Sequence, residues 1–326
     1  MTRPTSSARR HLIGGALALA AACAAPLPAL ADWEPRRPVN VILPYSAGGG
    51  TDAFARAVAA AVEAEGLLGV PLVVNNRPGA GGITGAAEAA GARPDGQTIM
   101  ITSAGSFLLT SMLKDTPVSP LEDYEIVAQI GDLDPAILVP AGSPYATLAD
   151  LMAALEADPG ALRWAHNGVG GAHNVAGQAF LDANGVEATG VPFQGGGPTR
   201  AAVIGEQVDF AVVGIQQAAG FENELRVLAL LAPERDGIAS EVPTASEQGF
   251  DYVEVSSPIV AFAPSGTDPE ILAGMEAMLE QVAASDSFSA DMRERGNVPE
   301  YLSGEEARAR LEILRDATTE VIDGLR

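Results

Sequence analysis

The sequence has very few of the residue types that support specialised chemistry. It contains one cysteine, Cys23, three histidines and a single lysine, Lys114, among 326 residues. A thiolate metal site, a disulfide or a Schiff-base enzyme would therefore have almost nothing to use. Aromatic residues make up only 5% of the chain, which argues against a stacking platform for single-stranded nucleic acid.

Positive charge is also scarce. The chain has 19 Lys and Arg residues against 42 Asp and Glu residues, a formal net charge of −23. A surface of this sign repels phosphate backbones, so the composition excludes nucleic acid as a partner. With 47% hydrophobic and 19% charged residues, the chain is too apolar to be disordered and is long enough for two domains.

The first 31 residues have the pattern of an export signal. Three arginines precede an apolar, alanine-rich run over residues 12–22, and Ala29-Leu30-Ala31 supplies a small-x-small cleavage pattern before Asp32. The apolar run is too short to span a bilayer, and no later run reaches the ~18 residues required. Removing residues 1–31, which hold three arginines and no acid, takes the net charge from −23 to −26. We therefore predict a cleaved signal peptide and a periplasmic mature protein.

Two features of this leader leave alternatives open. Cys23 would be acylated in a lipoprotein, although Ala20 stands where such leaders usually have leucine and Ala-Leu-Ala follows downstream. Cleavage after residue 31 instead leaves the mature protein without a thiol. The adjacent Arg9 and Arg10 also leave export by the general secretory route or by the twin-arginine route undecided.

From residue 38 onward, short apolar runs alternate with helical segments. We predict a strand at 39–43, a loop at 46–50 and a helix that begins at Thr51 or Asp52 and ends at Glu65-Gly66. A second unit follows, with a strand at 72–74, a glycine-rich loop at 78–82, a helix at 83–90 and a third strand at 98–102. This alternation predicts an α/β fold with mostly parallel sheets flanked by helices.

The pattern restarts near residue 135, which predicts a second lobe. Further strands are expected at 124–130, 136–139, 162–165, 189–193, 208–213 and 227–231. Helices are expected at 147–157, from about 172 to 183, after Asp268-Pro269 and after the capping box of Ser303 and Glu306. We predict that residues 32–135 and 262–326 form the first lobe, that residues 136–261 form the second, and that the chain crosses between them more than once.

Glycine-rich loops follow three of the predicted strands, after residues 43, 102 and 166. Open α/β sheets bind ligands beyond the carboxyl ends of their strands, so these loops are expected to meet at one cleft. The loop at 44–52 opens directly into a helix, whose free backbone N–H groups and dipole favour an anion. It lacks the sequences of a phosphate-binding P-loop and of a dinucleotide fingerprint. A tight strand-to-helix turn that needs glycine is the alternative reading.

The chain contains no clear catalytic group. His173 follows the loop at 167–172 and could cap a helix or touch a ligand, whereas His166 ends a strand and is interpreted as structural. No serine lies in a Gly-x-Ser-x-Gly elbow, and Ser46 and Ser103 have no evident His and Asp partners. The sequence therefore favours a binding protein without a cofactor or a metal over an enzyme.

Motifs in the correct order resemble those of the Bug receptors, the extracytoplasmic solute-binding proteins of tripartite tricarboxylate transporters. The similarity covers essentially the whole mature chain. It is carried by Val41-Ile42-Leu43-Pro44-Tyr45-x-x-Gly48-Gly49-x-x-Asp52, Asn76-Arg77-Pro78-Gly79-Ala80-Gly81-Gly82, Pro94-Asp95-Gly96, the loop at 168–173, the segment at 191–198, Val242-Pro243-Thr244 and Ala263-Pro264-x-Gly266-Thr267. Gln194 and Phe193 depart from the lysine and tyrosine that are common in the family.

The resemblance implies a two-lobed periplasmic binding protein of the Venus-flytrap kind, type II-like, that holds a small carboxylate between its lobes. The ligand would be a di- or tricarboxylate or an aromatic acid, held mainly by backbone amides and hydroxyls. The family's ligand-binding positions correspond here to Tyr45, Ala47, Gly48, Gly49, Thr51, Asp52, Ser103, Asn167, Gly168, Gly170, His173 and Phe193.

The resemblance also implies partners. A monomeric receptor would deliver its carboxylate to the integral-membrane subunits of a tripartite tricarboxylate transporter. Two alternatives stay open at this stage: an exported enzyme that acts on a small anion, and a receptor that reports ligand to a sensor kinase.

Overall fold

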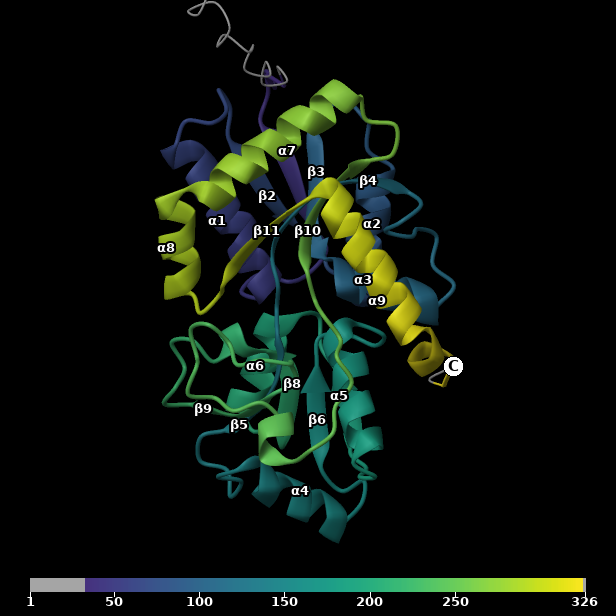
Figure 1. Ribbon diagram of the computed structural model, residues 1–326, viewed down its shortest axis with the longest axis vertical. Coiled ribbons are helices and arrows are strands. Elements are labelled where there is room, and N and C mark those ends of the chain that lie inside the picture. Colours follow the sequence, from purple (N-terminus) through teal and green to yellow (C-terminus); the bar gives the residue numbers. More distant parts are fainter. Residues whose placement is uncertain (1–32, 325–326) are drawn as a thin grey trace, which may run out of the picture.

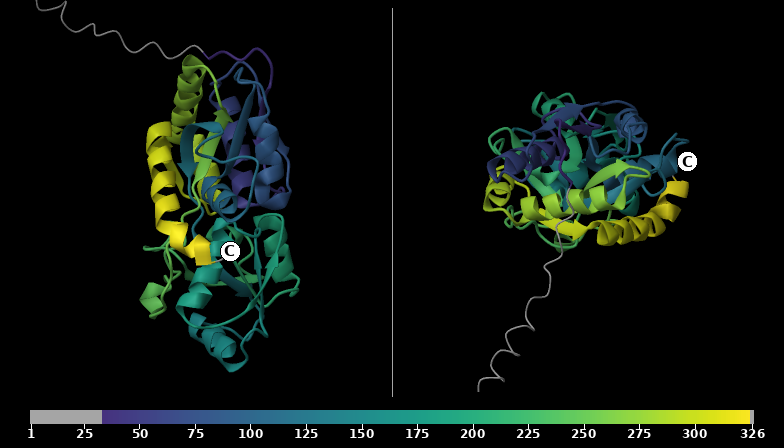
Figure 2. Two further views of the ribbon diagram at one scale, coloured as in Figure 1. Left: turned by 90° about the vertical axis from the view of Figure 1, so that its right-hand side faces the viewer. Right: turned by 90° about the horizontal axis from the view of Figure 1, so that it is seen from above.

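A computed structural model describes residues 33–324 and shows two α/β lobes stacked along the long axis of the molecule (Figures 1 and 2). The expected signal peptide, Cys23 and the arginine pair lie outside the described residues. Within residues 33–324, no helix is both long enough and apolar enough to cross a membrane.

The first lobe is built on a six-stranded sheet with the strand order β11-β4-β10-β3-β1-β2. Its strands are β1 (Val39–Leu43), β2 (Leu72–Asn76), β3 (Thr98–Ser103), β4 (Tyr124–Gly131), β10 (Ile259–Pro264) and β11 (Pro299–Ser303). β1 pairs in parallel with β2 and β3, but β10 pairs antiparallel with both β3 and β4, and β11 pairs antiparallel with β4. The sheet is therefore mixed, not mostly parallel, because a strand that returns from the second lobe enters between β3 and β4.

Helices cover both faces of this sheet, as the nearly continuous burial of its central strands requires. Val39, Val41 and Leu43 of β1 face one core and Ile42 faces the other. The first core lies under α1 (Gly50–Ala64), α7 (Pro269–Ala284) and α8 (Asp286–Glu294). The second core lies under α2 (Ile83–Ala90), α3 (Ala104–Leu113) and α9 (Gly304–Gly324).

The second lobe repeats this plan with a five-stranded sheet of order β7-β6-β8-β5-β9. Its strands are β5 (Pro135–Pro140), β6 (Arg163–His166), β7 (Thr189–Pro192), β8 (Phe210–Gly214) and β9 (Leu225–Leu230). β6 is parallel to β7 and β8, whereas β5 is antiparallel to β8 and β9, so this sheet is mixed as well. The faces are covered by α4 (Leu148–Ala157), α5 (Ala172–Ala183) and α6 (Gly196–Ile204).

The structure confirms the two-lobed α/β fold and most of the predicted elements. Ser303 and Glu306 form the predicted capping box, with the Ser303 N–H donating to the Glu306 carboxylate and the Glu306 N–H donating to Ser303 Oγ. Among the α-helices and strands of residues 33–324, five were not predicted: α3, α6, α8, β10 and β11. The lobe boundaries at residues 135 and 261 stay a prediction; β10 begins at Ile259, just before the second of them.

The chain crosses between the sheets twice, from β4 to β5 and from β9 to β10. Asp132 ties these two crossings together. Its Oδ1 accepts hydrogen bonds from the N–H of Leu133 (2.8 Å) in the first crossing and of Ser257 (2.9 Å) in the second. Its Oδ2 accepts a hydrogen bond from Arg310 of α9 at 2.6 Å. The carboxylate thus fixes both connections to the helix that lies beside them.

Asp134, two residues further on, makes the stability of the protein depend on pH. Burial raises the pKa of Asp134 to about 6, and the nearby carboxylates of Asp236, Glu300 and Glu254 add to the shift while Arg310 opposes it. A carboxyl group with a raised folded-state pKa favours the folded protein below its ordinary pKa, and this contribution is lost as the pH rises through about 6.

Replacing Asp134 with asparagine should therefore stabilise the protein at about pH 7.5 and change little at about pH 4. The free energy of unfolding of the variant minus that of wild type should be roughly 1–3 kcal/mol larger at pH 7.5 than at pH 4. Urea unfolding of both proteins at both pH values measures the difference, and comparison at each pH cancels the titration of groups that do not interact with Asp134. Asp132 does interact with it: burial raises the pKa of Asp132 to about 7 and the charge of Asp134 adds to the shift, so the replacement also lowers the pKa of Asp132. An equal difference at both pH values would contradict the prediction.

Candidate functional site

The loop between β1 and α1 is held in place by hydrogen bonds to the carboxylate of Asp52 and the amide of Asn76. Asp52 accepts hydrogen bonds from the Gly48 N–H, from Arg56 Nε and from Asn76 Nδ2, each at 3.0 Å. Burial alone would raise the pKa of Asp52, but these hydrogen bonds outweigh burial and hold it below its ordinary value. Asn76 Nδ2 also donates to the Tyr45 carbonyl at 3.0 Å. Asp52 therefore stays ionised and braces the loop.

This loop faces the beginning of α6 in the second lobe. The Ser46 N–H donates to the carbonyl of Gln194 at 3.2 Å, which joins the lobes backbone to backbone. A Cβ built on Gly197 would lie 2.9 Å from the Ala47 carbonyl oxygen, so only glycine allows this approach. The structure is that of a closed protein.

The first turn of α5 presents a second polar group. His173 is 1% exposed, and burial lowers its pKa to about 4, so the ring is neutral near pH 7. Asn167 Nδ2 lies 3.0 Å from His173 Nδ1; this assignment makes Nδ1 an acceptor and leaves the ring proton on Nε2. Nε2 is buried and has no hydrogen-bond partner among the described residues. It is a donor without an acceptor.

A small cavity of about 20 Å³ lies where these parts meet. That is room for about one water molecule. Residues from both lobes and from the first crossing line it: Tyr45, Ser46, Gly49, Gly50, Thr51, Asp52, Leu133, Asn167, His173, Gly195, Gly196, Val213, Gly214 and Gln216.

Three helices begin near this cavity, and each has a glycine as its N-cap residue: Gly49 for α1, Gly171 for α5 and Gly195 for α6. The first N–H of α5, that of Ala172, donates to Ser106 Oγ of the first lobe, whereas the first N–H groups of α1 and α6 have no side-chain acceptor among the described residues. The positive ends of three helix dipoles and the free N–H groups of α1 and α6 therefore converge, which is an arrangement that binds an anion. Among the described residues that line the cavity, none is Lys or Arg.

The structure brings half of the predicted site residues to the cavity. These are Tyr45, Gly49, Thr51, Asp52, Asn167 and His173. The phenol of Tyr45 is buried behind the loop, where burial raises its pKa to about 12. Gly48 and the exposed Ala47 lie at the rim, where the backbone meets Gly197.

The side chains and backbone of Ser103, Gly168, Gly170 and Phe193 contact other elements of the fold. Ser103 Oγ caps α3 through the Ser106 N–H and lies 2.6 Å from Ser257 Oγ, so the loop expected after residue 102 is in fact a helix start. Gly168 and Gly170 approach Gly81 and α3 of the first lobe, and Phe193 packs against the core under α6. These residues lie at contacts between elements and do not line the cavity.

Sequence reasoning missed Ser46, the Gly195-Gly196 pair and Gln216. Gly195 and Gly196 repeat the signal of the first loop, two glycines between a strand and a helix, and could have been found that way. Gln216 follows β8 in a short 3₁₀ turn, and its amide lies over the position that a Cβ on Gly50 would take. No local pattern points to that contact.

Ser106 is expected to stabilise the closed protein. Its Oγ accepts a hydrogen bond from the N–H of Ala172, the first residue of α5, at 3.0 Å across the lobes. Replacing Ser106 with alanine should weaken ligand binding about fivefold, because a hydrogen bond of this kind contributes ~1 kcal/mol. Ser111→Ala is the matched control, since Ser111 Oγ bonds only to the Leu108 carbonyl within α3. Calorimetric titration showing equal affinities for the two variants would contradict this role.

Two α/β lobes that meet around a cavity at helix N-termini have the architecture of a solute-binding receptor. The family model of the tripartite tricarboxylate transporter family receptors matches residues 54–310, and the chain belongs to this family. BugT of Bordetella pertussis is 28% identical over 285 residues, which cover 86% of this chain and 87% of BugT.

Solved structures agree with this assignment. MatC of Rhodopseudomonas palustris, with bound malate, superposes with a TM-score of 0.81 at 27% identity and covers 88% of this chain and 99% of its own. Rpa4515 of R. palustris, with adipate, gives a TM-score of 0.83 at 26% identity over 90% of this chain and 98% of its own. The resemblance to the Bug receptors, the fold class and the receptor function are thereby confirmed.

Proposed function

We propose that this receptor captures a dicarboxylate of about the size of malate or adipate and delivers it to the membrane subunits of a tripartite transporter. The observation that carries the proposal is the convergence of three helix N-termini, each with a glycine N-cap, on one cavity between the lobes. The similar proteins MatC and Rpa4515 hold malate and adipate, both of which are dicarboxylates.

We assign the ligand contacts by chemistry. The N–H groups at Gly49–Thr51 and Gly195-Gly196 would hold one carboxylate, and His173 Nε2 would donate to the ligand from the second lobe. Asp52 would act through the loop that it braces, because its carboxylate is occupied by Gly48, Arg56 and Asn76. Ser103, Gly168, Gly170 and Phe193 would act through the packing of the lobes.

We further propose a periplasmic monomer released by cleavage after residue 31. The leader pattern and the family support this location. Delivery to a transporter is favoured over an enzymatic role because the cavity contains no nucleophile paired with a base among the described residues. Co-purification with the transporter's membrane subunits, and not with a sensor kinase, would support transport over sensing.

A thermal-shift panel of mono-, di- and tricarboxylates tests the ligand class. A ligand at 100 times its dissociation constant should stabilise the protein by ~2.7 kcal/mol. We expect malate or adipate to raise the melting temperature more than acetate or citrate does. No shift with any member of the panel, or a shift equal to that of sodium chloride at the same ionic strength, would contradict the proposal.

A further inference from the structure

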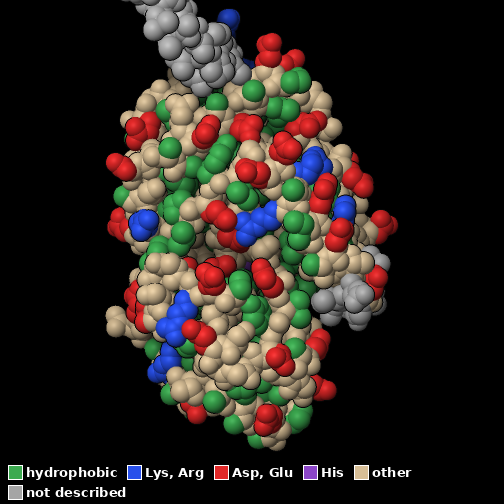
Figure 3. Space-filling model, viewed as in Figure 1, with side chains coloured by type: hydrophobic (Ala, Val, Ile, Leu, Met, Phe, Trp, Pro, Cys, Tyr) green, Lys and Arg blue, Asp and Glu red, His purple; other side chains and the backbone are tan. Residues whose placement is uncertain are grey.

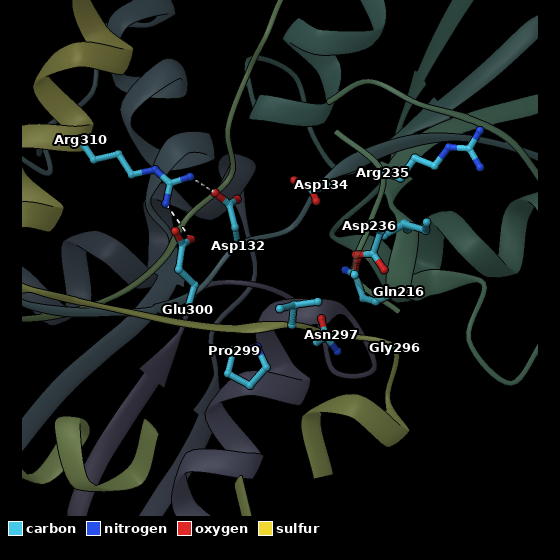
Figure 4. A pocket seen from close by; sticks show the side chains of 13 residues that line it. Asp132, Asp134, Gln216, Arg235, Asp236, Gly296, Asn297, Pro299, Glu300 and Arg310 are labelled. Carbon is cyan, nitrogen blue, oxygen red and sulfur yellow. Dashed lines mark hydrogen bonds and ion pairs between the residues drawn. The ribbon is translucent and has the colours of Figure 1, made fainter. Parts of the chain in front are cut away.

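A second, larger cavity of about 360 Å³ opens between the lobes next to the two crossings. Its walls come from the first crossing, from residues 215–216 and 235–237 of the second lobe, and from residues 296–300 and Arg310 of the first lobe. Gln216 lines both this cavity and the small cavity at the helix N-termini. Figure 3 shows acidic side chains around the hollow between the lobes, and Figure 4 shows the cavity itself.

Closure of the lobes completes this cavity. A Cβ on Gly296 of the first lobe would lie 2.6 Å from the Cβ of Ala219 in the second lobe. Asp236 and Glu300, which belong to opposite lobes, both lie close enough to Asp134 to repel its charge. Closure of the lobes therefore brings the carboxylates of Asp236 and Glu300 together around Asp134, and these charges lie further apart when the lobes are open.

The cations of the cavity wall offset this charge only in part. Arg310 is occupied by Asp132 at 2.6 Å and Glu300 at 2.8 Å. The guanidinium of Arg235 points away from Asp134 and Asp236 in Figure 4 and is bonded to Glu247 at 2.8 Å. No described residue makes a hydrogen bond to the carboxylate of Asp134, and Asp236 bonds only to the N–H groups of Ile238 and Ala239, both through Oδ1.

A buried amide supplies an independent sign of a missing donor. Asn297 is 3% exposed and lines the cavity. Its Nδ2 donates to the carbonyl of Arg295 at 3.1 Å, which fixes the orientation of the amide. Its Oδ1 is turned toward the cavity in Figure 4 and has no hydrogen-bond partner among the described residues. A buried acceptor left unpaired is costly, so a donor is expected there.

We propose that Asp134, Asp236 and Asn297 form a binding site for an organic ammonium group. The two carboxylates and Asn297 Oδ1 are hydrogen-bond acceptors, and a protonated amine offers three N–H donors with one positive charge. A carboxylate would be repelled. Among the described residues, no cluster of His, Asp and Glu has the geometry to hold a metal ion, so a hydrated divalent cation fits less well than an amine.

The position of this site couples it to the receptor's own ligand. Because the cavity is complete only when the lobes close, the ammonium group binds the closed protein preferentially. By linkage, the bound ammonium group raises the affinity of the protein for the carboxylate, and the bound carboxylate raises the affinity for the ammonium group by the same factor. Direct binding of an amine without carboxylate tests the site itself, so its failure is distinguishable from failure of the proposed carboxylate function.

The probe is 1,4-diaminobutane, a flexible dication, with butane-1,4-diol as the neutral control and sodium chloride at equal ionic strength as the screening control. At about 10 mM and neutral pH we expect the diamine to raise the melting temperature of the wild-type protein, and the diol and the salt not to do so. Asp134→Asn should weaken diamine binding at least roughly tenfold, since it removes an unpaired charge from the site.

Asp158→Asn is the matched variant, because it removes the same charge from an exposed position at the end of α4. It should bind the diamine as wild type does. The proposal is overturned if the diamine gives no shift beyond that of the salt, if magnesium chloride at equal ionic strength gives a larger shift, or if Asp134→Asn and Asp158→Asn bind the diamine equally.

Discussion

A leucine in place of Gly197 should abolish carboxylate binding while leaving the protein folded. Gly197 lies in the first turn of α6, in a conformation that other residues adopt readily. A Cβ there would lie 2.9 Å from the Ala47 carbonyl oxygen and 3.1 Å from the carbonyl carbon of Gly48. Both neighbours are backbone atoms of the other lobe and cannot rotate aside. The larger side chain should therefore hold the lobes apart.

Titration calorimetry with the ligand found by the panel measures this effect. We expect a loss of affinity of at least roughly 100-fold, which corresponds to ~2.7 kcal/mol. Gly142→Leu is the control, because a Cβ at Gly142 meets nothing within 4 Å. Small-angle scattering should show that the Gly197 variant keeps its open dimensions when ligand is added. Tight binding by the Gly197 variant would show that the two loops need not touch.

The second large effect is expected at His173. Its Nε2–H is a buried donor whose partner is absent from the described residues, and it lines the cavity where the anion would lie. A hydrogen bond to a charged group contributes about 1.5–3 kcal/mol, so His173→Ala should weaken carboxylate binding roughly 10- to 150-fold. The ring is neutral near pH 7, so this loss should be nearly constant from about pH 6 to pH 8.

A rescue variant separates the hydrogen bond from packing. Glutamine can place an amide N–H near the position of Nε2, so His173→Gln should recover a substantial part of the affinity that His173→Ala loses. Gln178→Ala changes a half-buried side chain of the same helix, whose amide donates to Asp182 at 2.9 Å, and should bind normally. If the alanine and glutamine variants lose affinity equally, His173 acts only as a packed residue at the helix start.

The unit from β1 to α1 could be predicted from sequence because its signals are local. A β-branched run, a glycine triplet and apolar residues at helical spacing, with Phe54 and Val58 buried, all point to one structure. α3 was missed because Ser103-Ala104-Gly105-Ser106 has the composition of a loop, although Ser103 caps the helix through the Ser106 N–H. A serine of this kind can cap a helix or form a turn, and the sequence alone does not distinguish the two.

Strand direction and lobe packing could not be predicted in this way. β10 is a plain apolar run, and its antiparallel pairing with β3 and β4 follows from the path of the chain back from the second lobe. α6 begins with Gly196, Gly197 and Pro198, which have poor helix propensity, and it forms against the core of the second lobe. Gly168 and Gly170 stay predicted ligand contacts, but a Cβ at Gly168 would lie 3.5 Å from Gly81 and one at Gly170 would lie 3.1 Å from Leu113, both in the first lobe, and no local pattern shows these approaches.

The three helix N-termini with glycine caps have a consequence for how the receptor could acquire new ligands. Main-chain N–H groups are present whatever the side chains are, so substitutions around the cavity leave the attraction for a negative charge in place. Length, branching and hydroxylation of the ligand would then be sorted by a small number of neighbouring side chains such as Leu133, Val213 and Gln216. A scaffold of this kind can exchange one acid for another in a few mutational steps without ever passing through a form that binds nothing.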